Sequence, residues 1–105
     1  MNTTPSDLTG AHTILNQLGG RRFIVMTGAR NLIGSTCDLS FRLPARFALH
    51  GIDVVQIRLN ESDLYDVTFA RLRGRHMATI ATHHDVYADQ LQPVFRAVTG
   101  LDTHL

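Results

Sequence analysis

The sequence predicts one α+β domain over residues 1–105, in which a five-stranded, largely antiparallel sheet is flanked by an N-terminal and a C-terminal helix. Three observations lead to this fold class. Apolar residues make up 44% of the chain and charged residues only 18%, a balance that supports a buried core. Helical spacing of apolar residues is confined to the two ends, and strand-like patterns lie between them. The connections between the later strands are too short for parallel crossovers, which need about a dozen residues.

The first helix is expected after a polar entry at Ser6 and Asp7, whose side chains can accept hydrogen bonds from free backbone amides. Its apolar residues follow the i, i+3, i+4, i+7 spacing of one helical face: Ala11, Ile14, Leu15 and Leu18. Gly19-Gly20 is predicted to end the helix, because glycine adopts the left-handed conformation at little cost. Residues 1–6 precede the helix and are expected to be flexible.

The first two strands are predicted from different patterns. Residues 23–26 are apolar on both parities, which is typical of a central strand covered on both faces. Residues 28–38 are polar and contain glycine, so a long loop is expected there. Residues 39–43 alternate apolar and polar side chains, which indicates a half-exposed second strand that Pro44 closes.

Three further strands are expected in the second half of the chain. Residues 53–59 and 65–69 show the same alternation, and a slip of parity near Ala70 indicates a bulge. A tight turn at Arg73-Gly74-Arg75 then leads into a weaker strand over residues 77–82.

The last helix is predicted from about Tyr87 to Thr99, with Gly100 as its stop. Pro93 lies inside this range and is expected to kink the helix or to displace its start. The helix should pack on the sheet in one common core, for which we expect Phe23, Val25, Phe41, Val55, Ile57, Val67, Phe69, Leu91 and Phe95.

Basic charge is concentrated on the predicted sheet. All ten lysine-or-arginine residues are arginines, and nine of them lie between Arg21 and Arg75. Alternate connections of a meander lie at the same end of the sheet, so basic residues from several connections should meet there. They form a candidate nucleic-acid-binding or anion-binding surface: Arg21, Arg22, Arg42, Arg46, Arg71, Arg73, Arg75 and His76, with His50 nearby. Only Asp53 opposes these residues. The other end should hold carboxylates opposed by Arg30 and Arg58: Asp38, Glu61, Asp63, Asp66 and Asp85.

Arginine forks bind phosphates in two-point fashion, and a hairpin with alternating arginines over residues 71–75 can bridge phosphates on one strand. Two simpler interpretations remain open. A GC-rich genome encodes its cations mainly as arginine, and charges on an edge hairpin discourage pairing between sheets. Tyr65 and Phe69 share the parity of the core, so the sequence indicates no aromatic stacking platform for single strands.

No catalytic residue, metal site or cofactor is predicted. Cys37 is the single cysteine and has no local activating partner, and the lack of an internal disulfide favours a reducing, cytoplasmic location. His83-His84-Asp85 has metal-binding residue types, but adjacent histidines on a strand point to opposite faces. No apolar run approaches the roughly 20 residues of a membrane-spanning helix, so no membrane partner is expected.

Several phrases occur in combination along the chain: residues 14–20 (ILNQLGG), 23–31 (FIVMTGARN), 39–44 (LSFRLP), Tyr65-Asp66-Val67 and the closing Tyr87-Ala88-Asp89-Gln90-Leu91, Phe95 and Thr99-Gly100-Leu101. Over about residues 12–105 the chain resembles a widespread group of small proteins carried by bacteriophages, prophages and other mobile elements. The resemblance implies a phage or mobile-element origin, and no activity, since none is assigned to that group. Members of the group often have a basic residue where this chain has Pro93, so the last helix is expected to be atypical.

These observations predict a small non-enzymatic accessory protein that contacts the phosphates of DNA or RNA through the arginine-rich end of its sheet. The alternative is a protein-binding module, such as an inhibitor of a host enzyme or of a defence complex, in which the same arginines meet an acidic patch. Both functions require only a rigid charged surface, and the sequence does not separate them.

Overall fold

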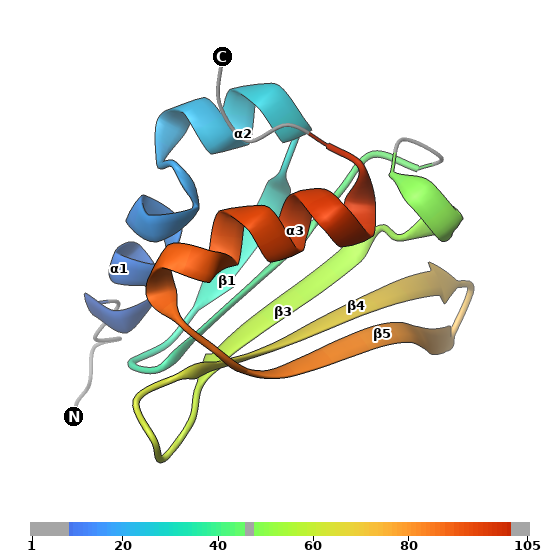
Figure 1. Cartoon of the computed structure of the whole chain (residues 1–105). Helices are drawn as coiled ribbons and strands as arrows, with labels where there is room; N and C mark the ends of the chain where they lie inside the picture. Colours follow the sequence, from blue (N-terminus) through green and yellow to red (C-terminus); the bar gives the residue numbers. More distant parts are fainter. Residues whose placement is uncertain (1–8, 46–47, 102–105) are drawn as a thin grey trace, which may run out of the picture.

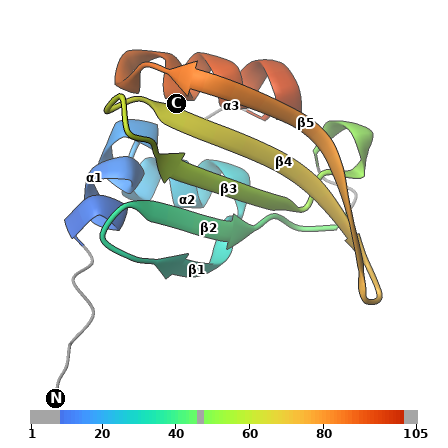
Figure 2. The ribbon, with the colours of Figure 1, turned by 90° about the horizontal axis from the view of Figure 1, so that it is seen from below.

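Five antiparallel strands form one sheet, and three α-helices cover one of its two faces (Figure 1). The structure, a computed structural model, describes residues 9–45 and 48–101. Seen from below, the sheet lies in front of the helices and its second face is open (Figure 2). The predicted fold class is therefore confirmed: a small α+β domain with an antiparallel sheet and helices at both ends.

The strands follow one another across the sheet in the order β1-β2-β3-β4-β5, and each pair of neighbours is antiparallel. This is the predicted meander. In chain order the elements are α1 (Thr9–Leu18), α2 (Arg21–Thr27), β1 (Arg30–Gly34), β2 (Asp38–Arg42), the 3-10 turn η1 (Leu49–Gly51), β3 (Val54–Leu59), β4 (Tyr65–Arg73), β5 (His76–Val86), the 3-10 turn η2 (Ala88–Gln90) and α3 (Leu91–Thr99).

The prediction of a strand over residues 23–26 is wrong, because these residues form the middle of helix α2. Phe23 and Thr27, four positions apart, are both buried, whereas Val25 between them is 73% exposed. A run that is apolar at every position fits either period, and here packing on the sheet selects the helix. Gly28 ends α2 with a φ of 72°, and its N–H donates to the carbonyl of Ile24 at 2.9 Å.

The predicted loop over residues 28–38 contains the missing strand, β1. Its residues are almost all exposed, and an irregularity interrupts its pairing with β2 between Arg30 and Ile33. An edge strand that buries little carries no alternating pattern, which explains why the sequence did not reveal it. The sheet thus keeps five strands, but its first one lies later in the chain than predicted.

Four phenylalanines join α2, α3 and the sheet in the core. The ring of Phe95 on α3 lies 5.0 Å from that of Phe23, 6.3 Å from that of Phe41 and 6.4 Å from that of Phe69, measured between centroids. Edge-to-face and tilted geometries of this kind are favoured by the ring quadrupoles. Eight of the nine predicted core residues are buried, and Val25 is the exception.

The parity slip near Ala70 is a real bulge: the register of β4 on β5 shifts between Phe69 and Ala70. At the end of the chain, η2 precedes α3, so Pro93 is the third residue of that helix. Proline is tolerated in a first turn, where its missing N–H would have no helical partner. The predicted displacement of the helix start is therefore confirmed, and Gly100 ends the helix with a φ of 75°.

Across residues 9–45 and 48–101, no helix has both the length and the apolar character needed to cross a membrane. The expected flexibility of residues 1–6 falls outside the described residues, and so does the placement of Arg46.

Candidate nucleic-acid interface

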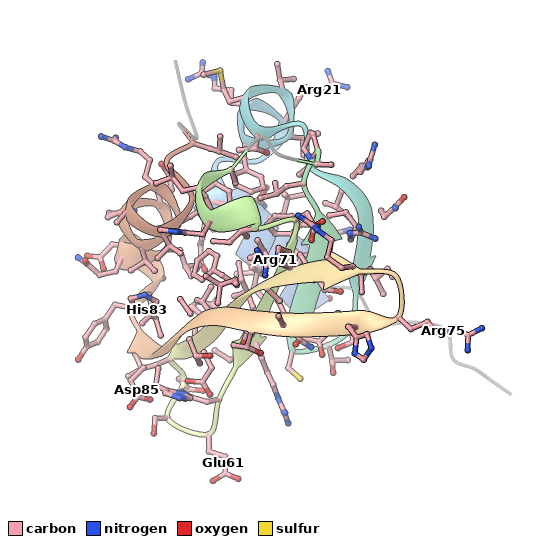
Figure 3. All side chains as sticks on the ribbon, turned by 90° about the vertical axis from the view of Figure 1, so that its right-hand side faces the viewer. Arg21, Glu61, Arg71, Arg75, His83 and Asp85 are labelled. Atoms are coloured by element: carbon pink, nitrogen blue, oxygen red, sulfur yellow. The ribbon has the colours of Figure 1, made fainter. Side chains whose placement is uncertain are left out.

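Because residues 23–26 are helical and the first strand is Arg30–Gly34, three arginines lie elsewhere than the sequence predicted: Arg21, Arg22 and Arg30. Arg21 and Arg22 lie in the first turn of α2 and not at the start of a strand, so they do not belong to the end of the sheet where the sequence placed them. Figure 3 shows Arg21 well apart from Arg75 at the hairpin tip. Arg30, which was expected at the acidic end, instead pairs with Arg42 through the antiparallel register of β1 and β2.

The end of the sheet that carries Arg30 and Arg42 is strongly cationic. It holds five described arginines against one aspartate, which leaves a formal charge of +4 with histidines neutral; this basic end comprises Arg30, Arg42, Arg71, Arg73, Arg75 and Asp53. His50 and His76 are exposed beside it.

The opposite end of the sheet carries five carboxylates and one arginine, a formal charge of −4: Asp38, Glu61, Asp63, Asp66, Asp85 and Arg58. We call it the acidic end. Glu61 and Asp85 lie together away from Arg75 in Figure 3. Because Arg30 lies at the basic end, one arginine opposes the carboxylates of the acidic end instead of the two that the sequence predicted.

The β4–β5 hairpin projects beyond the rest of the sheet at the basic end. The pairing of β3 with β4 stops at Val54 and Ala70, whereas β4 and β5 continue together to Arg73 and His76 (Figure 1). Residues 71–76 therefore have no third strand beside them, and their arginines stand at the rim of the molecule.

Asp53 anchors this projecting hairpin. Its side chain is only 5% exposed, and its Oδ1 accepts the backbone N–H of Leu72 at 2.8 Å. Its Oδ2 lies 3.3 Å from Nη1 of Arg73 and 3.8 Å from Nη2 of Arg42. A buried carboxylate needs such partners, because its desolvation would otherwise cost several kcal/mol. The same contacts hold two of the arginines in place.

The remaining hairpin arginines differ in role. Arg71 packs along η1, where a Cβ added at Gly51 would lie 3.0 Å from its Cδ, and its Nε is buried. Arg75 lies in the turn and is exposed, and its side chain forms no hydrogen bond or ion pair with another described residue. Figure 3 shows Arg75 pointing outward from the tip. Arg42, Arg71 and Arg73 are thus tied into the fold, and Arg75 is available to a partner.

Hydrogen bonds from one asparagine organise the acidic end. Nδ2 of Asn60 donates to Oδ1 of Asp66 at 3.1 Å and to Oδ1 of Asp85 at 2.9 Å. The hydrogen bond from Asn60, together with those from the N–H of Asp85 and from His84, lowers the pKa of Asp66 below its ordinary value.

The adjacent histidines of β5 have different partners. His84 lies beside Asp66, whereas His83 packs edge-on against Phe69, with 6.2 Å between ring centroids. Among the described residues, no three His, Cys, Asp or Glu side chains gather as metal ligands.

A shallow hollow of about 310 Å³ opens on the helix-free face next to the basic end. Every strand contributes to its lining, which includes Ile33, Ser40, Arg42, Val54, Leu72 and Met77. The side chains of Ile33 and Met77 are 68% and 58% exposed. The sequence did not predict this hollow, because Ile33 lies on strand β1, which was not recognised. The apolar pair of Leu72 and Met77 on either side of the predicted hairpin turn was a sequence signal for part of its lining.

Comparison of the chain with protein-family models, with curated proteins and with solved structures finds no match.

Proposed function

We propose that this chain is a small non-enzymatic accessory protein, of phage or mobile-element origin, that contacts nucleic-acid phosphates through the basic end of its sheet. The observation that carries the proposal is the projecting β4–β5 hairpin, which the buried carboxylate of Asp53 anchors through Leu72 and Arg73 and which carries the exposed Arg75 in its turn.

Pre-ordered cations suit phosphate binding for a physical reason. A flexible arginine loses side-chain entropy when it binds, whereas Arg73 and Arg42 are already held by Asp53. Guanidinium groups match phosphate oxygens in two-point geometry, and the surplus charge of the basic end releases counterions from the nucleic acid. Such contacts fix position and carry no base sequence, so the binding should be general.

The choice of test variant follows from the contacts of each arginine. Arg73→Glu would set a second carboxylate against buried Asp53 and would confuse binding with stability. Arg75→Glu with Arg30→Glu avoids this problem, because both side chains are exposed. The matched control is Glu61→Arg, a charge reversal at an exposed site on the acidic end.

The experiment measures affinity for mixed DNA and RNA oligonucleotides at about 50 and 200 mM salt. The parent should bind with a clear salt dependence. The double variant should bind at least roughly ten-fold more weakly with a flatter salt slope, because two phosphate contacts are lost. Glu61→Arg should bind as well as the parent or slightly better. A parent that binds no nucleic acid would overturn the proposal and favour an acidic protein partner for the same surface.

A further inference from the structure

The hollow beside the basic end combines two kinds of surface. Its floor is aliphatic, with Val54 and Leu72 half-buried and Ile33 and Met77 largely exposed. Its rim is polar, with Ser40 and the guanidinium of Arg42. Exposed apolar side chains that cluster in a concave site beside fixed polar groups are typical of a ligand site, and about 310 Å³ lies at the small end of such sites.

The position of Arg42 limits the ligand chemistry. Its Nε donates to the backbone carbonyl of Asp53 at 3.2 Å, and its Nη2 lies 3.8 Å from Oδ2 of the same residue. The guanidinium has five N–H donors, so it retains donors for an anion while these contacts hold its orientation. The ligand should therefore join a flat apolar face to a negative group.

An unpaired nucleotide has both properties, and a duplex does not offer them together. In a double helix the bases are paired and stacked, so their flat faces are covered and a protein surface outside the grooves meets mainly the backbone phosphates. In a single strand the bases can turn outward, and each one has an apolar π-face beside its phosphate. The sequence indicated no aromatic platform, but the thioether of Met77 can supply the contact, since sulfur packs favourably on aromatic rings.

We infer that the hollow lined by Ile33, Arg42 and Met77 holds an unpaired base of a single strand, so that the basic end prefers single-stranded nucleic acid to duplex. This inference rests on the proposed function and adds the substrate class to it. The nucleotides before and after this base would then run along the basic end in opposite directions, one part of the strand toward Arg30 on β1 and the other toward Arg75 in the β4–β5 turn.

The first test uses the unaltered protein. Three labelled probes of about 15 nucleotides are compared at about 50 mM salt: a single strand, the corresponding duplex and a single strand with abasic sites. The abasic strand keeps every phosphate and lacks bases. The single strand should bind roughly ten-fold tighter than the other two probes. Equal affinity for the normal and abasic strands overturns the inference, and so does tighter binding of the duplex.

The second test removes the aliphatic lining. Met77→Ser with Ile33→Ser should weaken single-strand binding by roughly ten-fold and leave duplex binding unchanged. Both side chains are exposed, so the fold should survive, and the melting temperature checks this. Val25→Ser, another exposed apolar position but on α2, is the matched control and should bind like the parent. If the double variant binds single strands as tightly as Val25→Ser does, the hollow is not the base site.

The two proposals fail in different ways. If the parent binds all three probes alike with a steep salt dependence, the phosphate-binding function stands and the base site does not. If the parent binds none of them, both proposals fall.

Discussion

Asp53 shows how one residue determines what its neighbours can do. The sequence identified it only as the single acid at a basic end. In the structure it is buried, bonds the backbone of Leu72 and sits beside Arg42 and Arg73. The charge that appeared to oppose the arginines therefore positions them. Removing it would free two cations but would also release the hairpin that presents them.

Asp53→Ala should lower the free energy of unfolding by roughly 2–4 kcal/mol, because it leaves the N–H of Leu72 without its acceptor and two guanidinium groups without their counterion. Urea denaturation measures the change. Asp53→Asn keeps an oxygen acceptor and loses the charge, so its stability should lie between those of the parent and the alanine variant. An alanine variant as stable as the parent would show that the carboxylate does not anchor the hairpin.

The difference between Arg73 and Arg75 also belongs to the residue scale. Both occur in one Arg-Gly-Arg turn and look equivalent in the sequence. Only Arg73 reaches Asp53, whereas Arg75 points out of the turn (Figure 3). Sequence spacing cannot make this distinction, since Asp53 is 20 residues away from Arg73 along the chain.

Among the elements, α2 and β1 diverge most from expectation, and for opposite reasons. The run over residues 23–26 is too uniformly apolar to show a period, and β1 is too exposed to show one. Strands β2, β3 and β4 each bury one face, so their alternation is visible and they were found. β5 is mostly exposed, and the sequence predicted only a weaker strand over residues 77–82, whereas β5 covers His76–Val86. Periodicity is clearest for an element that buries one side.

Two substitutions test the arrangement of the helices. Phe95→Ala should destabilise the protein by roughly 3–5 kcal/mol, because it removes a buried ring that contacts Phe23, Phe41 and Phe69. Val25→Ala should change stability by less than about 0.5 kcal/mol, because that side chain is exposed on α2. Chemical denaturation of both variants gives the comparison. A large loss for Val25→Ala would favour the buried strand that the sequence suggested, against helix α2.

At the scale of the whole molecule, charge is separated along the sheet. The basic end and the acidic end carry formal charges of +4 and −4 in a body whose longest dimension is 40 Å. A Debye length of about 10 Å at 0.1 M salt screens most of the attraction between the two ends. Within each end, like charges lie much closer together and repel.

This separation makes stability depend on salt in a defined direction. Sodium chloride raised from about 10 to 200 mM should increase the free energy of unfolding by roughly 0.5 kcal/mol, because it screens repulsion within each end. The contacts of buried Asp53 should respond less. Arg75→Gln removes one cation from the basic end and should reduce the increase. A stability that falls over this salt range would show that attraction between the ends outweighs the local repulsion.

The sequence by itself determined the fold class, the antiparallel order of the later strands, the bulge at Ala70, the glycine stops and most of the core, because each of these follows from local backbone preference or from the burial of one face. It also showed that nine of the ten arginines lie between Arg21 and Arg75, although Arg21 and Arg22 belong to helix α2 and not to the sheet. Only the tertiary structure decided that residues 23–26 are helical, that Arg30 belongs to the basic end, that Asp53 holds Arg73 and that Ile33 and Met77 share a hollow. Each of these features depends on contacts between residues that are distant in the chain. A local sequence pattern does not predict such contacts, because tertiary packing decides which residues meet.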